Sequence, residues 1–127
     1  MVKQFYSCID SLIPCPQPEQ HSTIEAMARK CGGKITYSTS EDSILRNTQV
    51  WIEERVERIN NLDGLIFFTV TQFYCRGEFN TPLLERLLAK NLEVHFARES
   101  LTFQVPEDTS SESGTRILMF LSHLSAI

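Results

Sequence analysis

Residues 62–70 (LDGLIFFTV) constrain the fold more than any other part of this sequence. After Gly64 almost every position is apolar, without the alternation of apolar and polar residues that a half-buried strand shows. The β-branched and aromatic content of this short run is typical of a strand that is buried on both faces. Such strands occur in parallel sheets that carry helices on their faces. The segment therefore predicts an α/β fold with a parallel central sheet.

The rest of the chain alternates between strand-like and helix-like segments. Further strands are expected at residues 3–8, 34–38 and 92–97, and helices at 19–31, 43–60 (or from 48), 81–90 and 115–127. Three prolines predict a loop over residues 9–18, while Thr81 and Pro82 are expected to cap and to open the third helix. The alternation predicts right-handed crossovers and three layers, a mostly parallel sheet with helices on both faces. A length of 127 residues suits one domain that spans residues 1–127.

Functional groups of parallel sheets gather beyond the carboxyl ends of the strands. In this sequence those ends fall at residues 7–11, 39–42, 69–76 and 98–101. The order of the elements therefore predicts the place of a functional site, although it names no reaction.

Composition excludes several classes of function. The formal charge of −4 would repel a phosphate backbone, so composition alone predicts no nucleic-acid partner. The four cysteines lack zinc-ligand spacing, and we expect reduced packing thiols in a cytoplasmic protein, with no metal and no cofactor. Since the sequence has no run of about 20 apolar residues, we expect no membrane span.

Three segments together carry a family pattern: residues 18–35 (PEQHSTIEAMARKCGGKI), 62–101 (LDGLIFFTVTQFYCRGEFNTPLLERLLAKNLEVHFARESL) and 107–127 (EDTSSESGTRILMFLSHLSAI). They resemble the catalytic domain of the serine site-specific recombinases (the resolvase/invertase family). In that family an apolar strand ends in an Asp-Arg-x-x-Arg turn and leads into a helix. A further strand, a Ser/Thr-rich loop and a long helix that opens with Gly-Arg then follow. The resemblance implies a resolvase-like fold and a role in site-specific DNA recombination.

The family's catalytic residues are largely replaced in this chain. Recombinases attack DNA with a serine in a Tyr-x-Arg-Val-Ser pattern, and arginines stabilise the charge of the transition state. When Tyr6 is aligned with the family's tyrosine, Cys8 stands at the arginine and Asp10 at the serine. A carboxylate there would repel the incoming phosphate. Ser11 or Ser7 could replace the nucleophile after a local shift, so three alternatives stay open at this position.

Two arginines complete the candidate catalytic set. Arg46 lies near the family's Arg-Pro position, and Arg76 lies one place beyond the last arginine of the turn. The other turn positions are Thr71, Gln72 and Cys75. We therefore expect that strand cleavage is lost, and whether the chain is an enzyme stays open.

Each candidate also has a structural interpretation. Ser11 can be an ordinary loop hydroxyl, Asp10 a cap of a backbone amide, and Arg46 one half of a solvated ion pair. His95, which is flanked by Val94 and Phe96, is expected to be a packed, hydrogen-bonded histidine.

The apolar residues of the last helix exceed what so small a domain can cover, which predicts an interface. The resemblance implies that this helix forms a homodimer and continues towards a DNA-binding segment. Three functions follow: a recombinase relative; a non-enzymatic dimerisation or regulatory module of the same fold; and an unrelated ligand-binding or receiver-like domain. Receivers need clustered acidic groups at strand ends, where only Asp10 lies, so the last is the weakest.

Overall fold

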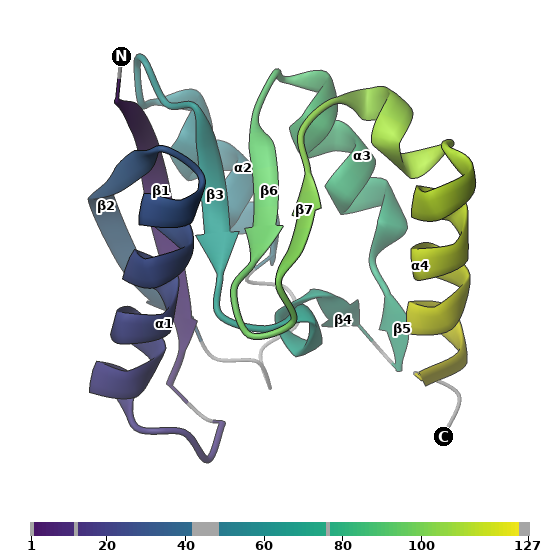
Figure 1. Cartoon of the computed structure of the whole chain (residues 1–127), viewed down its shortest axis with the longest axis horizontal. Helices are drawn as coiled ribbons and strands as arrows, with labels where there is room; N and C mark the ends of the chain where they lie inside the picture. The colour runs from purple at the N-terminus through teal and green to yellow at the C-terminus, as the bar shows by residue number, and fades with distance from the viewer. Residues whose placement is uncertain (1, 12, 42–48, 76, 125–127) are drawn as a thin grey trace.

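The computed structural model describes residues 2–11, 13–41, 49–75 and 77–124. Within them, a five-stranded sheet in the order β2-β1-β3-β6-β7 forms the centre (Figure 1). The first four strands are parallel, and the edge strand β7 is antiparallel to β6. A separate antiparallel pair joins β4 to β5. The strands are β1 (Lys3–Asp10), β2 (Gly33–Glu41), β3 (Gly64–Phe67), β4 (Tyr74–Cys75), β5 (Glu78–Phe79), β6 (Glu93–Phe96) and β7 (Leu101–Phe103).

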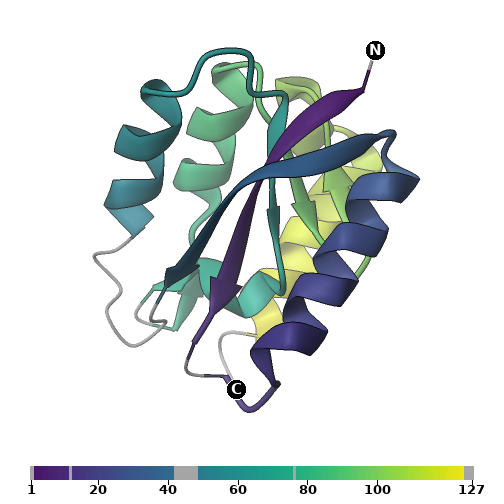
Figure 2. The same cartoon turned by 90° about the vertical axis from the view of Figure 1, so that its left-hand side faces the viewer.

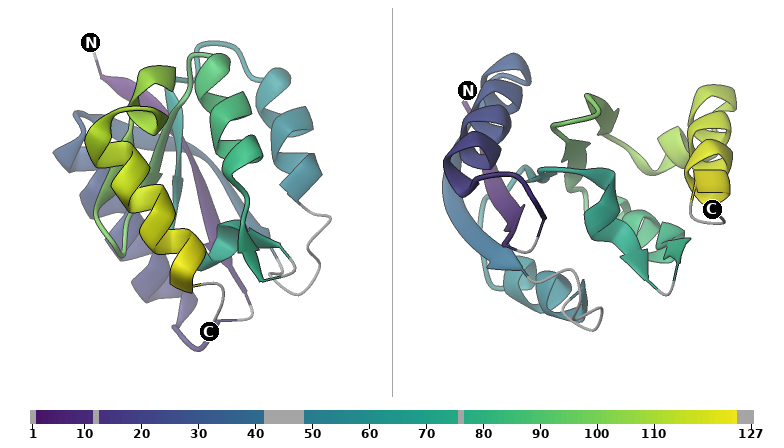
Figure 3. Two further views of the ribbon diagram at one scale, coloured as in Figure 1. Left: turned by 90° about the vertical axis from the view of Figure 1, so that its right-hand side faces the viewer. Right: turned by 90° about the horizontal axis from the view of Figure 1, so that it is seen from below.

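Helices cover both faces of the sheet. They are α1 (Gln17–Lys30), α2 (Gln49–Glu57), α3 (Thr81–Ala89) and α4 (Glu112–Leu124), with the 3₁₀ helices η2 (Val70–Phe73) and η3 (Pro106–Thr109). Figure 2 shows α1 on one side of the strands and α2 and α3 on the other. Seen from below in Figure 3, α4 lies beyond α3 at the β7 end of the sheet. The expected α/β architecture, with a mostly parallel sheet between helices, is confirmed.

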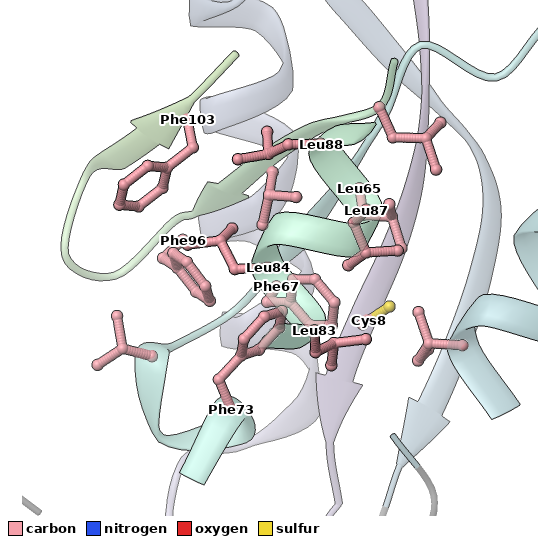
Figure 4. Packing of buried hydrophobic residues seen from close by; sticks show 14 of the residues in the cluster. Cys8, Leu65, Phe67, Phe73, Leu83, Leu84, Leu87, Leu88, Phe96 and Phe103 are labelled. Atoms are coloured by element: carbon pink, nitrogen blue, oxygen red, sulfur yellow. The ribbon is translucent and has the colours of Figure 1, made fainter. Parts of the chain in front are cut away.

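Alternation along β1 sends its side chains to two different cores. Phe5 and Ile9 pack with Ile24 and Met27 of α1, whereas Tyr6 and Cys8 pack on the opposite face. The strand β3 is buried on both faces, as residues 62–70 predict. The core opposite α1 is the larger one. In it, Phe67, Phe73 and Phe96 meet the leucines of α3 (Figure 4).

Several expected boundaries are wrong. The strand β1 continues to Asp10, where a loop was expected from residue 9, because a helix side chain binds the backbone of its last residue (described below). The helix α1 begins at Gln17 with Pro18 in its first turn, two residues earlier than expected. The strand β2 is longer than expected, β3 is shorter, and α2 ends at Glu57. The expected helical residues 43–48 lie outside the described residues.

The antiparallel edge strand β7 was not expected, because its three residues are too few to show a period of two. At α3 the cap is Asn80 and not Thr81: Asn80 Oδ1 accepts a hydrogen bond from the Leu83 amide at 3.1 Å. In the part of the chain that the structure describes, no helix has both the length and the apolar character needed to cross a bilayer.

Candidate functional site

The carboxyl end of β1 is fixed by one buried glutamine. Gln20 of α1 is fully buried, and its Oε1 accepts a hydrogen bond from the Asp10 amide at 3.0 Å. Its Nε2 donates to the carbonyl oxygens of Asp10 and Cys15, both at 2.9 Å. Three backbone groups around the turn that contains Ser11 are thus satisfied by a single side chain. This residue was not identified from the sequence, although a glutamine close to the inner face of a helix could have indicated a buried hydrogen-bonding group.

The two candidate serines lie in different surroundings. Ser7 is buried on the α1 face of the sheet, and its Oγ has no hydrogen-bond partner among the described residues. Ser11 follows directly after β1 and is exposed. Asp10, which the alignment places at the nucleophile position, is only 1 % exposed. Of the three residues at this position, only Ser11 offers its side chain to solvent.

The candidate arginines Arg46 and Arg76 lie outside the described residues, so the predicted phosphate pocket stays a prediction. The described residue Gln72 joins the start of η2 to strand β1. Its Oε1 accepts from the Thr69 amide at 3.0 Å, and its Nε2 donates to the Cys8 carbonyl oxygen at 3.1 Å. At this position of the family's turn, the chain therefore has an amide that ties η2 to β1.

Glu99 links the loops that follow β3 and β6. Its Oε2 accepts a hydrogen bond from the buried Thr69 hydroxyl at 2.6 Å, and its Oε1 accepts from the Val70 amide at 3.1 Å. A carboxylate at the start of η2 satisfies a backbone donor that the helix itself leaves open. Both oxygens of Glu99 thus have a structural use.

A mostly apolar pocket lies between these loops and α4. Its volume is about 710 Å³, and its lining comes from residues after β3, residues after β6 and the helix α4. The apolar part of the lining is made by Val70, Tyr74, Leu101, Ile117, Phe120 and Leu121. The pocket stands at two of the four strand ends where the sequence predicts functional groups.

Tyr74 attaches α4 to this edge of the molecule. Its hydroxyl donates a hydrogen bond to the Leu121 carbonyl oxygen at 3.1 Å. Burial, and after it the negative charge of Glu99, raise the pKa of Tyr74 above its ordinary value, which keeps the phenol protonated as a donor. On the outward side of α4, Met119 is 58 % and Phe120 is 62 % exposed. Of the apolar residues of the last helix that were expected to exceed the core, Leu121 is buried, Ile117 and Leu118 are partly buried against the core, and Phe120 is exposed.

A second polar cluster lies at the opposite, amino end of the sheet. His95 is fully buried, as expected for a packed histidine, and its Nε2 lies 2.9 Å from Glu93 Oε1. The other Glu93 oxygen pairs with Lys3 Nζ at 2.6 Å. His95 Nδ1 lies 3.0 Å from Thr102 Oγ1 and 3.6 Å from Cys31 Sγ. The pattern Glu93-x-His95 places both side chains on one face of β6, a signal that sequence reasoning did not use.

The contacts of this second cluster indicate a structural role. Since the neighbours of His95 lie at opposite ring nitrogens, they cannot converge on one metal ion, and the described residues contain no metal-binding group of three or more His, Cys, Asp or Glu. Burial, which outweighs the hydrogen bond to Glu93, lowers the pKa of His95, and burial raises that of the Cys31 thiol. A protonated thiol beside an enclosed imidazole is a poor nucleophile.

The chain matches no known family by comparison: family models, curated proteins and solved structures all gave no match.

Proposed function

We propose that this chain is a resolvase-like domain associated with site-specific DNA recombination, which pairs with a second copy through α4 and does not cleave DNA. The element order supports the likeness: β3, α3, β6 and α4 come in the order that the resemblance implies, although η2, β4 and β5 stand between β3 and α3, and β7 and η3 stand between β6 and α4. DNA contact is assigned to a separate segment, since a net charge of −4 gives the chain itself no attraction for phosphate.

The carboxyl end of β1 supports the loss of cleavage. At the family's arginine and serine positions the chain has Cys8 and Asp10, which are both buried. Neither a thiol nor a carboxylate in these places can supply the bidentate phosphate contact of an arginine. Ser7 is enclosed by the α1 core, and Ser11 is the one candidate hydroxyl that DNA could reach.

The observation that carries the pairing proposal is the outer face of α4. Met119 and Phe120 are neighbours, both large, apolar and more than half exposed, and Tyr74 and Leu121 hold the helix that presents them. Isolated exposed apolar residues are common, and the occurrence of two adjacent ones on an anchored helix supports the pairing proposal. A two-fold arrangement would bury the same patch on both copies.

Sedimentation equilibrium tests the pairing with matched variants. Phe120→Asp places a charge in the interface, and loss of two buried phenyl rings should raise the dimer dissociation constant at least about 100-fold. Val2→Asp makes the same change at a residue of similar exposure (61 %) far from α4 and should leave the constant unchanged. A wild-type chain that stays monomeric at high concentration, or a Phe120→Asp chain that pairs like wild type, refutes the proposed interface.

Covalent trapping tests the cleavage part. With supercoiled plasmid as substrate, the wild-type chain should give no detergent-resistant protein–DNA adduct. An adduct that disappears in Ser11→Ala would instead establish an active, rearranged serine site.

The alternative is a dimerisation or regulatory module of the same fold without a part in recombination, and the negative charge of the chain favours it. Adding the chain to a recombination reaction of an active family member separates the two. A change in yield with wild type, absent with Phe120→Asp, supports the recombination role.

A further inference from the structure

We propose that the pocket beside α4 binds a small apolar monoanion, of which a medium-chain carboxylate is the simplest example. This ligand site goes beyond the proposed pairing role, because the whole pocket is built within one chain.

The size and the walls of the pocket suit an apolar ligand body. Its volume of about 710 Å³ falls within the range of about 300–1,000 Å³ that is usual for small-molecule sites. Val70, Leu101 and Ile117 face it from three separate segments of the chain. It also lies beyond the carboxyl ends of β3 and β6, where α/β sheets place their ligands.

The charged residues of the lining select the head group. They are Arg98, Arg116 and Glu99, two positive charges and one negative charge, so the net charge of the lining is +1. Glu99 already accepts hydrogen bonds with both oxygens, and Arg116 pairs with Glu112 at 2.7 Å. Within the described part of the chain, no hydrogen bond or ion pair engages the guanidinium of Arg98. Arg98 is thus the group that can hold a carboxylate through two parallel hydrogen bonds.

Other ligand classes fit less well. A cation would be repelled by the positive charges of two arginines. A neutral apolar molecule would leave the guanidinium group of Arg98 without a partner in the complex. A nucleotide or a DNA backbone needs hydrogen-bonding groups along its sugars and phosphates, and these mostly apolar walls offer few. One negative charge on an apolar body is the combination that matches the lining.

Calorimetric titration with decanoate, below its micelle concentration, tests the proposal. We expect saturable binding at one site per chain. Because each buried methylene is worth about fourfold in affinity, octanoate should bind about 15-fold more weakly. Decanol and decyltrimethylammonium, which share the chain and lack the negative charge, should bind at least about tenfold more weakly than decanoate.

Three variants locate the site. Arg98→Gln should weaken decanoate about tenfold, whereas Arg58→Gln, a change of another exposed arginine that does not line the pocket, should leave affinity unchanged. Thr71→Trp starts from an exposed lining residue and should block the pocket without disturbing the core. Thermal unfolding and sedimentation of each variant show that the fold and the pairing persist.

The results separate this inference from the pairing proposal. Absence of saturable binding, equal affinity for decanoate and decanol, or equal effects of Arg98→Gln and Arg58→Gln would each overturn the ligand site. Phe120 lines the pocket and also lies on the proposed pairing face, so decanoate is titrated at chain concentrations below the dimer dissociation constant, and pairing is measured separately by sedimentation of wild type and Phe120→Asp without ligand. Conversely, a monomeric chain that binds decanoate through Arg98 supports the ligand site and refutes the pairing.

Discussion

Replacing Gln20 by methionine should destabilise the fold by about 3 kcal/mol and loosen the turn that carries Ser11. Methionine nearly conserves the volume of the side chain, so no cavity term contributes. The change removes three buried or partly buried hydrogen bonds, to the Asp10 amide and to the Asp10 and Cys15 carbonyls. At about 1 kcal/mol for each hydrogen bond, the sum is about 3 kcal/mol, with more if the buried amide stays unsatisfied.

Urea unfolding, followed by circular dichroism, measures this loss, and the unfolding midpoint on heating should fall by about 10 °C. Gln17→Met is the control: it makes the same replacement at an exposed position in the same helix and should stay within about 0.5 kcal/mol of wild type. Amide exchange at Asp10 should accelerate in Gln20→Met alone. A loss below 1 kcal/mol, or equal effects of both variants, would show that the turn does not depend on this side chain.

Two further predictions concern the amino end of the sheet and the base of α4. Since burial keeps the pKa of His95 below 6.5 in the folded chain, the unfolded state binds more protons below that pH. The contribution of His95 to the free energy of unfolding should therefore be fully present above pH 6.5 and decrease as the pH drops below it. Urea titrations at a series of pH values should show that the free energy of unfolding depends less on pH in His95→Gln, and equal slopes in the two proteins would refute the assignment. A Cβ at Gly114 would collide with the Asp108 carbonyl oxygen, so Gly114→Ala should cost about 1–3 kcal/mol in thermal unfolding and weaken pairing by displacing α4. An unchanged melting temperature would mean that α4 and η3 do not pack this closely.

The sequence predicts those parts of the fold whose signal is local. Residues 62–70 show a doubly buried strand because both faces of β3 are apolar, and the leucines of α3 repeat at helical spacing. The architecture follows from the alternation of such segments. The end of β1 was missed because Asp10 is a residue that strands disfavour, and its stabilising partner, Gln20, comes from another element. A single-sequence pattern cannot show a compensation of that kind.

The candidate site also has features that the sequence predicts and features that it does not. Its position beyond the strand ends was predictable from the order of the elements, and the last helix showed its surplus of apolar residues. The pocket itself was not predictable, since Val70, Leu101 and Ile117 meet only after the chain has folded. Alternation along β1 would place Ser7 and Ser11 on the same face, and the two differ because β1 ends at Asp10, which leaves Ser7 buried within the strand and Ser11 exposed beyond it.

Three polar side chains among the described residues of the carboxyl edge are hydrogen-bonded to other parts of the chain. Gln20 of α1, Gln72 of η2 and Glu99 after β6 each form hydrogen bonds with backbone groups or a neighbouring hydroxyl at this edge. A catalytic site needs such groups aimed at the place where charge develops on a substrate. Here they connect the loops after β1, β3 and β6 to neighbouring elements by hydrogen bonds. Among the described residues, this edge presents to solvent Ser11, the apolar pocket with Arg98, and the exposed part of α4, and the last two are where we propose recognition of a ligand and of a second copy.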